Sequence, residues 1–563
     1  MKNKFLKLIC LLLCLVLALS AFAGCKGKNT GKKTKKSKKN TSVSSELSSD
    51  LSSDTSSDEW IDEEPDDQVE EDDPVDEEPI DEEEPDTIAE ATVKNTAPLT
   101  QNVMGAGMGL YNPFAFTDNT RVTDDEVANT EFDRLQNMGV HTVRSLFKFE
   151  WLDEGRNDGV WNWDSYKMKA LYKWLKAMKD RNINVFINPW SFGHINNMES
   201  YRYWDTKGLY ADTYEKTIEN WANGMTEVML KLQAKGFTNA NGVLLFTEPI
   251  YADMREADPD IDNKYVYMVK LVDKKLKAAG IRQSIRLMGP NYSNTDTLLI
   301  EKCMTEAYDC LDIFSQHRYA NLQELTSNTG PDVAAGEYGG FVEKVKELNK
   351  ANKPFWIDEY NVSAELEKDG YGTSTIGFDN IYRGLQQAVI YNSCMNMGGV
   401  NGMMIWTLAD QQWPENRGNN KVAGFYDGVL FHGLLPDMNK TMVPKSQYYA
   451  FSLLSKYTGT KGNSVYTTEC ESLEVTVSAT RLADGNWTFI VTNTNIENTL
   501  FKLNFEKQLN GLKLYRHQYV ASEVKPTNAA KIIPANKTIL NVKTGFTDVL
   551  KPYSVAVYTT VKG

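Results

Sequence analysis

Short apolar runs alternate with longer segments of helical periodicity over residues 103–457. The apolar runs predict eight strands, at residues 103–110, 140–147, 183–189, 242–246, 284–289, 312–317, 354–360 and 402–408. Apolar positions at helical spacing predict helices at residues 124–138, 165–181, 214–235, 264–279, 341–351, 378–397 and 448–457. This alternation predicts an α/β fold, a parallel (β/α)8 TIM barrel. An open doubly wound sheet is the main alternative, and it is disfavoured because no glycine-rich nucleotide fingerprint follows the first strand.

The pattern changes after about residue 460, where helical periodicity gives way to short alternating runs. These runs predict strands at residues 473–479, 486–492, 500–505, 512–519 and 554–558. Asp484-Gly485 is typical of a hairpin turn between the first two. Residues 461–563 are therefore predicted to form a C-terminal all-β sandwich after a barrel at residues 101–460.

Residues 1–24 have the pattern of a lipoprotein signal peptide. Lys2, Lys4 and Lys7 precede an apolar run at residues 11–19, which is too short to favour a membrane span. The small residues before Cys25 resemble the lipobox, in which the cysteine carries the lipid anchor. A plain secretory signal is the alternative. We expect a monomer anchored through Cys25 to the outer face of the bacterial cytoplasmic membrane.

The segment at residues 25–100 is predicted to be a disordered charged tether. Residues 26–39 contain eight lysines, and residues 58–86 contain 19 acidic residues and no basic ones. Such a composition buries too little apolar surface to fold. The acidic run contributes −19 and so outweighs the whole net charge of −15. The rest of the chain has no basic bias that would indicate a nucleic-acid partner.

Four cysteines, Cys303, Cys310, Cys394 and Cys470, lie in sequence that is expected to fold. Their spacing matches no metal-binding pattern. Cys303 and Cys310 form either a disulfide or two thiols, and thiols are favoured. We expect neither a metal nor another cofactor.

Two glutamates mark the ends of predicted buried strands. Glu248 follows the apolar run at residues 242–246, and Glu359 lies near the end of the run at residues 354–360. A carboxylate beside an apolar strand is costly unless it has a partner or a function. Because the carboxyl ends of barrel strands converge, the pair predicts a glycosidase with two carboxylates. The alternative is that each glutamate pairs with a basic loop residue. Asp358, next to Glu359, is expected to face the other way.

Several motifs carry a resemblance to clan A glycoside hydrolases. Residues 246–249 read Phe-Thr-Glu-Pro, which is similar to the Asn-Glu-Pro of strand four in that clan. Residues 356–360 read Trp-Ile-Asp-Glu-Tyr, which resembles the nucleophile motif of strand seven. Residues 317–319 and 405–407 resemble the His-x-Tyr of strand six and the tryptophan of strand eight. Over about residues 100–460, the layout is most similar to families five and thirty-nine.

The resemblance implies a role for each matching residue. Glu248 would be the general acid and base, and Glu359 the nucleophile. Tyr319 would donate a hydrogen bond to the nucleophile, Arg144 would keep it ionised, and Trp406 would form the floor of the sugar site. The candidate substrate-binding residues are Arg144, Asn188, Trp190, Thr247, His317, Tyr319, Trp406 and Trp413.

Thr247 departs from the family pattern, which usually has an asparagine that binds the sugar 2-hydroxyl. We nevertheless interpret the chain as a retaining hydrolase of β-linked polysaccharides or oligosaccharides that needs no metal. One alternative, suggested by Thr247, is a non-catalytic carbohydrate-binding lipoprotein on a degenerate barrel. The other is a transglycosylase that uses the same site.

Overall fold

The computed structural model describes residues 85, 87–110, 125–153, 161–189, 213–250, 255–256, 258–293, 296–320, 330–362, 381–409, 411–413, 423–425, 430–431, 443–458, 461–527 and 529–563. All of them belong to one compact unit, Asp81–Gly563. The predicted signal peptide, Cys25, nearly all of the acidic run and Trp190 lie outside the described residues. Among the helices that the structure describes, none has both the length and the apolarity needed to cross a bilayer.

Eight parallel strands close into a barrel, which confirms the predicted architecture. In spatial order they are β10 (Gly402–Trp406), β3 (Gly105–Leu110), β4 (Thr142–Phe147), β5 (Asn184–Pro189), β6 (Ala240–Leu244), β7 (Arg286–Tyr292), β8 (Ile313–Ala320) and β9 (Phe355–Val362). Each strand lies within two or three residues of its predicted apolar run. The functional groups that follow the strands are therefore brought to one end of the barrel.

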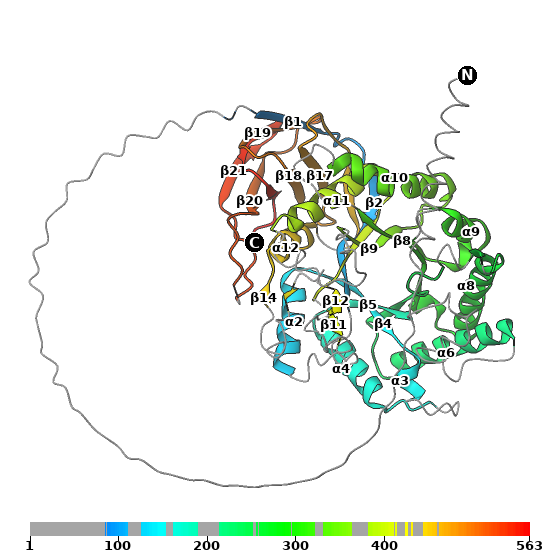
Figure 1. Cartoon of the computed structure of the whole chain (residues 1–563). Helices are drawn as coiled ribbons and strands as arrows, with labels where there is room; N and C mark the ends of the chain where they lie inside the picture. Colours follow the sequence, from blue (N-terminus) through cyan, green and yellow to red (C-terminus); the bar gives the residue numbers. More distant parts are fainter. Residues whose placement is uncertain are drawn as a thin grey trace, which may run out of the picture. The chain divides into compact units, whose positions relative to one another are not determined.

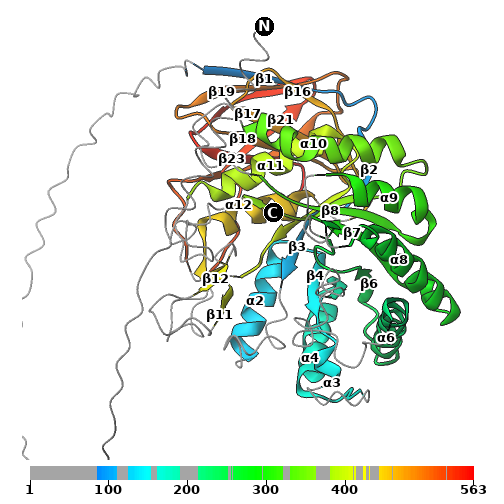
Figure 2. The same cartoon turned by 45° about the vertical axis from the view of Figure 1, so that its right-hand side comes forward.

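Helices surround the barrel strands (Figure 2). They are α2 (Asp125–Asn137), α3 (Glu150–Asp153), α4 (Tyr166–Asp180), α6 (Tyr214–Ala234), α8 (Ile261–Ala278), α9 (Leu298–Glu306), α10 (Gly330–Leu348), α11 (Arg383–Met397) and α12 (Ser446–Thr458). Helix α4 shows why they form: the Ser165 hydroxyl caps its first turn by accepting from the Met168 N–H at 3.0 Å. Its buried face recurs at helical spacing through Met168, Leu171 and Leu175.

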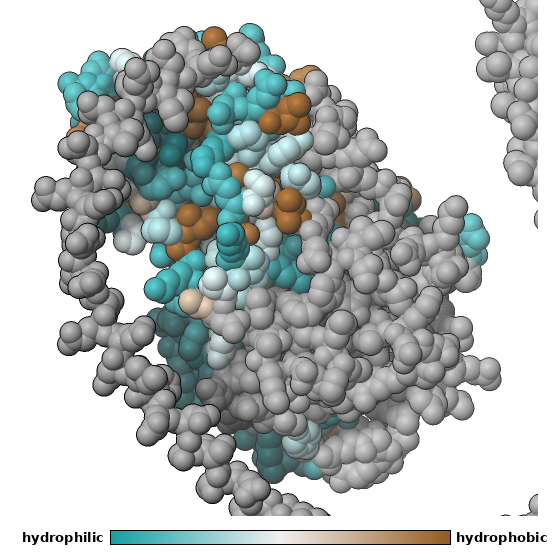
Figure 3. Space-filling view, turned by 60° about the vertical axis from the view of Figure 1, so that its left-hand side comes forward, coloured by the Kyte–Doolittle hydropathy of each residue, from teal (hydrophilic) through white to brown (hydrophobic). Residues whose placement is uncertain are grey.

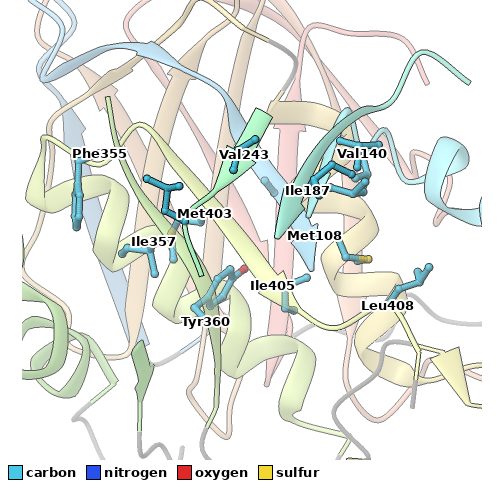
Figure 4. Packing of buried hydrophobic residues seen from close by; sticks show 14 of the residues in the cluster. Met108, Val140, Ile187, Val243, Phe355, Ile357, Tyr360, Met403, Ile405 and Leu408 are labelled. Atoms are coloured by element: carbon cyan, nitrogen blue, oxygen red, sulfur yellow. The ribbon is translucent and has the colours of Figure 1, made fainter. Parts of the chain in front are cut away.

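Alternate side chains of each barrel strand enter different packing layers. Phe186, Leu244 and Trp356 belong to a cluster inside the barrel. Their neighbours Val243 and Ile357 belong to the larger cluster between strands and helices, part of which is drawn in Figure 4. This alternation means that an inward polar side chain near the end of a strand faces the mouth of the barrel.

The sandwich consists of two mostly antiparallel sheets that enclose a second core. One sheet has the order β16 (Thr468–Cys470), β1 (Thr87–Val93), β19 (Thr499–Phe505) and β22 (Gly545–Leu550). The other has the order β2 (Thr100–Val103), β15 (Asn463–Tyr466), β17 (Val475–Arg481), β18 (Trp487–Asn493), β23 (Ser554–Thr559), β20 (Leu512–Val520) and β21 (Lys537–Val542). The predicted sandwich is therefore confirmed, with several strands that the sequence did not predict.

Strand β1 corrects the predicted boundary of the tether. The sequence placed residues 87–93 in the tether, but they pair in parallel with β19 along their whole length. Ala89, Ala91 and Val93 are buried, whereas Ile88 and Glu90, at the alternate positions, are exposed. The acidic composition of the preceding residues obscured this alternation, because small alanines carry a weak apolar signal.

The four cysteines of the folded region are free, and Cys303 and Cys394 are buried. Burial raises the pKa of the Cys303 and Cys394 thiols, which makes them poor nucleophiles at neutral pH. The thiol alternative for Cys303 and Cys310 is therefore correct.

Helix α11 joins the barrel to the sandwich (Figure 1) through the buried side chain of Asn392. Its Nδ2 donates to Thr476 Oγ1 at 3.1 Å and to the Ile490 carbonyl at 3.0 Å. Its Oδ1 accepts from Ser478 Oγ at 2.7 Å. Both the oxygen and the nitrogen of the Asn392 amide thus have hydrogen-bond partners on β17 and β18. This asparagine therefore fixes the sandwich sheet against helix α11.

Asn392→Ala is expected to lower the free energy of unfolding by about 1–3 kcal/mol, because it leaves buried groups on β17 and β18 without partners. Chemical denaturation measures the change. Asn137→Ala, at an exposed position that ends α2, is the matched control and should stay within about 0.5 kcal/mol of the parent. Equal stability of the two variants would mean that this contact does not hold the interface.

The sandwich surface shows small hydrophobic patches separated by hydrophilic residues (Figure 3). In the described part of the sandwich, the exposed large apolar residues are Ile88, Leu473, Ile496 and Leu540. None of these four is aromatic, so they offer no ring faces on which sugars could stack.

Candidate active site

Asp358 and Glu359 both reach the mouth of the barrel because β9 contains a bulge. Ile357 pairs with Gln316 and Glu359 pairs with His317, so Asp358 is an extra residue. Pairing with β10 shows the same irregularity. The expectation that Asp358 faces away from Glu359 is therefore wrong, because a bulge breaks the strict alternation of a strand.

Glu359 is held by side chains from two other barrel strands, Arg144 on β4 and Tyr319 on β8. Arg144 forms an ion pair with its Oε2, and the Tyr319 hydroxyl donates to its Oε1. Arg144 is 1% exposed and Glu359 is 7% exposed, so the pair is screened from water. An opposite charge in contact favours the ionised carboxylate, which is the form a nucleophile needs.

Glu248 lies beyond the end of β6, in a left-handed stretch of backbone. Its φ is +46° and that of Phe246 is +68°. Phe246 is buried with its ring centroid 4.3 Å from that of Trp221, which anchors this turn. The Glu248 side chain is 27% exposed. It is therefore more accessible than Glu359, as suits a group that exchanges protons with substrate and water.

The two carboxylates share one small space with His317. An oxygen of Glu248, an oxygen of Glu359 and a ring nitrogen of His317 all lie within 4.8 Å of one another. Retaining glycosidases need carboxyl groups about 5–5.5 Å apart, whereas inverting enzymes need about 6.5–9.5 Å. The spacing between the Glu248 and Glu359 oxygens is closer to the retaining separation than to the inverting one.

The proton of His317 can be assigned from its partners. Arg144 Nη1 lies 3.1 Å from Nε2, and a guanidinium can only donate, so Nε2 accepts. The proton is then on Nδ1, which lies 3.3 Å from Glu248 Oε1. The same three residues, Glu248, His317 and Glu359, have the spacing of a metal site. Because the protonated Nδ1 has no lone pair to give, the arrangement fits a metal poorly.

Thr247 and Asn188 form a hydrogen-bonded pair below the two carboxylates. The Thr247 hydroxyl donates to Asn188 Oδ1 at 2.8 Å, and Arg144 Nη1 lies 3.3 Å from the same oxygen. The Asn188 amide nitrogen lies 3.3 Å from the Leu244 carbonyl. Asn188 is fully buried. The structure thus places Asn188 behind the site, where it positions Arg144 and Thr247.

Trp406 lies against Arg144, with the guanidinium carbon 5.1 Å from the ring centroid. The peptide bond from Trp406 to Thr407 is cis. Gly109 on β3 leaves room for both side chains, since a Cβ there would lie 2.8 Å from the Trp406 ring and 3.2 Å from Arg144 Nε. Trp413 lies in β11 (Gln411–Trp413), and its side chain and all of Trp190 lie outside what the structure describes.

Gly109→Ala is expected to lower kcat/KM by about 100-fold, because a displacement of Trp406 and Arg144 by a few tenths of an ångström disturbs the nucleophile. Steady-state kinetics on a released-sugar assay measures the loss. Gly336→Ala is the control, since a Cβ at that exposed glycine of α10 meets no atom within 4 Å. An active Gly109→Ala enzyme would show that Trp406 and Arg144 tolerate displacement.

Sequence reasoning missed Asn291 and Tyr265. Asn291 is fully buried on β7, and its Oδ1 accepts from the Glu248 backbone N–H at 3.1 Å. The Tyr265 hydroxyl donates to the Leu245 carbonyl at 2.9 Å, and burial raises the pKa of Tyr265 well above its usual value, so it remains a donor. The available signal for Asn291 was a polar residue two positions after the run at residues 284–289. The predicted strand stopped there, before Pro290.

No family model matches the sequence, and no curated protein matches it. Solved structures do match the fold. A GH30 endoxylanase from Clostridium papyrosolvens C71 aligns with a TM-score of 0.55 and 14% identity, over 84% of this chain and 99% of that chain. A GH51 arabinofuranosidase from Xanthomonas axonopodis pv. citri gives a TM-score of 0.55 at 13% identity, with 84% and 99% covered.

A GH39 β-xylosidase from Caulobacter crescentus has a TM-score of 0.53 and 14% identity, over 84% of this chain and 100% of that chain. The sequence resemblance to family thirty-nine thus agrees with one of these structures. The alignments cover the greater part of the chain and nearly the whole of each neighbour. The chain has the fold of clan A glycoside hydrolases, a (β/α)8 barrel joined to a β-sandwich.

Proposed function

We propose that this protein is a retaining glycoside hydrolase, with Glu359 as the nucleophile and Glu248 as the acid and base. One observation carries the proposal. A buried glutamate that is paired with Arg144 and Tyr319 faces a more exposed glutamate, and their oxygens lie within 4.8 Å. Their environments differ in the way the two roles require.

In the first step, a carboxylate oxygen of Glu359 attacks the anomeric carbon. The bond from that carbon to the glycosidic oxygen breaks, and Glu248 gives its proton to the departing oxygen. A glycosyl ester on Glu359 and an ionised Glu248 result. His317 Nδ1–H, 3.3 Å from Glu248 Oε1, can donate to the carboxylate as its charge develops.

In the second step, Glu248 accepts a proton from a water molecule that attacks the same carbon. The ester bond to Glu359 breaks, the sugar leaves with its original configuration, and Glu248 is protonated again. The Arg144 guanidinium and the Tyr319 hydroxyl stabilise the carboxylate that is released. A sugar hydroxyl in place of water would give transglycosylation by the same residues.

The names of the structural neighbours suggest the substrates to test first. They are an endoxylanase, a β-xylosidase and an arabinofuranosidase. We therefore place β-linked plant-wall polysaccharides and oligosaccharides first among candidate substrates. Trp406 packs on Arg144 beside the nucleophile, and we expect it to form part of the floor of the sugar site.

Product stereochemistry tests the mechanism. The protein is incubated with xylan, arabinoxylan and other plant and microbial β-glycans, and proton NMR follows the anomer that forms first. A first product with the same anomeric configuration as the cleaved bond, which is β for a β-glycan, would support the proposal. A first product with the opposite configuration would contradict it. The length of the products separates hydrolysis from transglycosylation.

Thr247 favours a second candidate function, which is carbohydrate binding without turnover. Its hydroxyl is directed to Asn188 at 2.8 Å, so it replaces the usual amide with a shorter group that already has a partner. Retention of the protein on one glycan without sugar release would favour this reading.

We also propose that the protein is anchored by a lipid on Cys25 at the outer face of the bacterial cytoplasmic membrane. The charged residues after Cys25 would then form a spacer. Cys25→Ala should move the protein from the membrane fraction to the soluble fraction, and unchanged fractionation would contradict the anchor.

A further inference from the structure

The backbone that carries Glu248 adopts a conformation that non-glycine residues rarely take. Both Phe246 and Glu248 have left-handed φ angles, of +68° and +46°. Such backbone costs of the order of 1–3 kcal/mol per residue and persists only where its surroundings hold it. The position of the Glu248 carboxylate therefore depends on the contacts that hold this turn.

One of these contacts comes from the buried amide of Asn291 on β7. Its Oδ1 accepts from the Glu248 N–H at 3.1 Å, and its Nδ2 donates to Asp358 Oδ2. The two partners fix the orientation of the Asn291 amide. Its oxygen must face the Glu248 N–H, which is a donor, and its NH2 group must face the Asp358 carboxylate, which is an acceptor. Asn291 is itself held in place, since its backbone N–H donates to Ser315 Oγ at 3.1 Å.

Asp358 completes a link between the two glutamates. It is covalently bonded to Glu359, it is fully buried, and the bulge in β9 directs it inward. Its Oδ1 lies 3.7 Å from His317 Nε2, beyond hydrogen-bond distance, so Asp358 acts through the Asn291 amide and through its peptide bond to Glu359. A buried carboxylate is retained only with polar partners, and here the firm partner is the Asn291 amide.

We propose that Asn291 and Asp358 are positioning residues that set the separation of the two glutamates. The amide of Asn291 fastens the Glu248 backbone to the residue that precedes Glu359. Loss of this link would displace the proton donor while the nucleophile, which is held by Arg144 and Tyr319, stays in place. The inference rests on the proposed function and adds to it two positioning residues, one on β7 and one on β9.

Substrates with different leaving groups distinguish positioning from general support of the fold. A dinitrophenyl β-glycoside leaves without protonation, whereas an alkyl glycoside or a natural glycan needs the Glu248 proton. Asn291→Ala is expected to lower kcat/KM by about 100-fold for the natural glycan and by less than about fivefold for the dinitrophenyl substrate. kcat/KM is the right measure, because it reports the first step alone.

Asn392→Ala is the matched control for stability. It removes a fully hydrogen-bonded, buried asparagine that lies between α11 and the sandwich. It should lower the melting temperature and leave the ratio of the two kcat/KM values unchanged. Asn291→Ala should change that ratio by at least about tenfold. Both variants are assayed well below their melting temperatures.

A reciprocal exchange tests the hydrogen bond itself. Asn291→Asp places two carboxylates against each other and should reduce activity on the natural glycan at least as much as Asn291→Ala. Asn291→Asp combined with Asp358→Asn reverses donor and acceptor, and position 291 still accepts from the Glu248 N–H. The double variant should recover to within about tenfold of the parent.

Two results together would support the proposal. The double variant recovers activity on the natural glycan, and Asn291→Ala changes the ratio of kcat/KM between the natural glycan and the dinitrophenyl substrate. Equal losses on both substrates, or no rescue by the double variant, would overturn it while leaving the glycosidase assignment intact. A parent protein that is inactive on every substrate would overturn the proposed function, and this inference with it.

Discussion

Glu359→Gln is expected to abolish turnover while the protein stays folded. The amide cannot attack the anomeric carbon, so kcat should fall by at least about a thousandfold. Glutamine keeps the volume of the side chain and still offers an oxygen to Tyr319 or Arg144. Sugar release from the best substrate of the panel measures turnover, and thermal unfolding measures the fold.

Glu347→Gln is the matched control for this substitution. Glu347 lies on α10 with 65% of its side chain exposed and forms an ion pair with Lys344 at the surface. Exposed ion pairs of this kind contribute about 0–1 kcal/mol, so the control should behave like the parent. Residual turnover in Glu359→Gln above a tenth of the parent value would remove Glu359 from the role of nucleophile.

Arg144→Met is expected to move the acidic limb of the pH–activity profile to higher pH. The guanidinium pairs with the buried Glu359 carboxylate and favours its ionised form. Without that charge, Glu359 binds a proton more readily, and a protonated carboxyl group is not a nucleophile. Activity should therefore be lost first at low pH, and it should be reduced by about 100-fold near neutrality.

The same substitution leaves a buried carboxylate without its charged partner. The free energy of unfolding at neutral pH should fall by about 3–5 kcal/mol. Arg144→Lys keeps the charge but loses the planar contact with Trp406, so its pH profile should resemble that of the parent more closely. An unchanged acidic limb in Arg144→Met would show that another group sets the charge of Glu359.

Much of the barrel could be predicted because its strands are buried on both sides. Runs such as residues 183–189 and 402–408 are mostly apolar and lie between amphipathic segments, so the order of strands and helices is visible in the sequence. Glu248 and Glu359 stood out for the same reason, as charges at the ends of apolar runs.

Other features depended on contacts that a sequence does not display. The inward turn of Asp358 results from a bulge that is defined only by pairing with β8 and β10. Asn291 acts through residues 43 and 67 positions away in the chain. Strand β1 carries a weak apolar pattern and is stabilised by partners about 400 residues later.

The pairing of β1 also has a mechanical consequence. The chain passes from β1 in one sheet of the sandwich through β2 in the other before it reaches the first barrel strand. Force applied to the residues that precede Thr87 would load the seven residue pairs between β1 and β19 in shear. Force applied at the N-terminal side should thus break the sandwich before the barrel. A single-molecule pulling trace in which the barrel unfolds first would contradict this. With the lipid anchor proposed above, the sandwich would unfold first under force, and the geometry of the active site would be preserved.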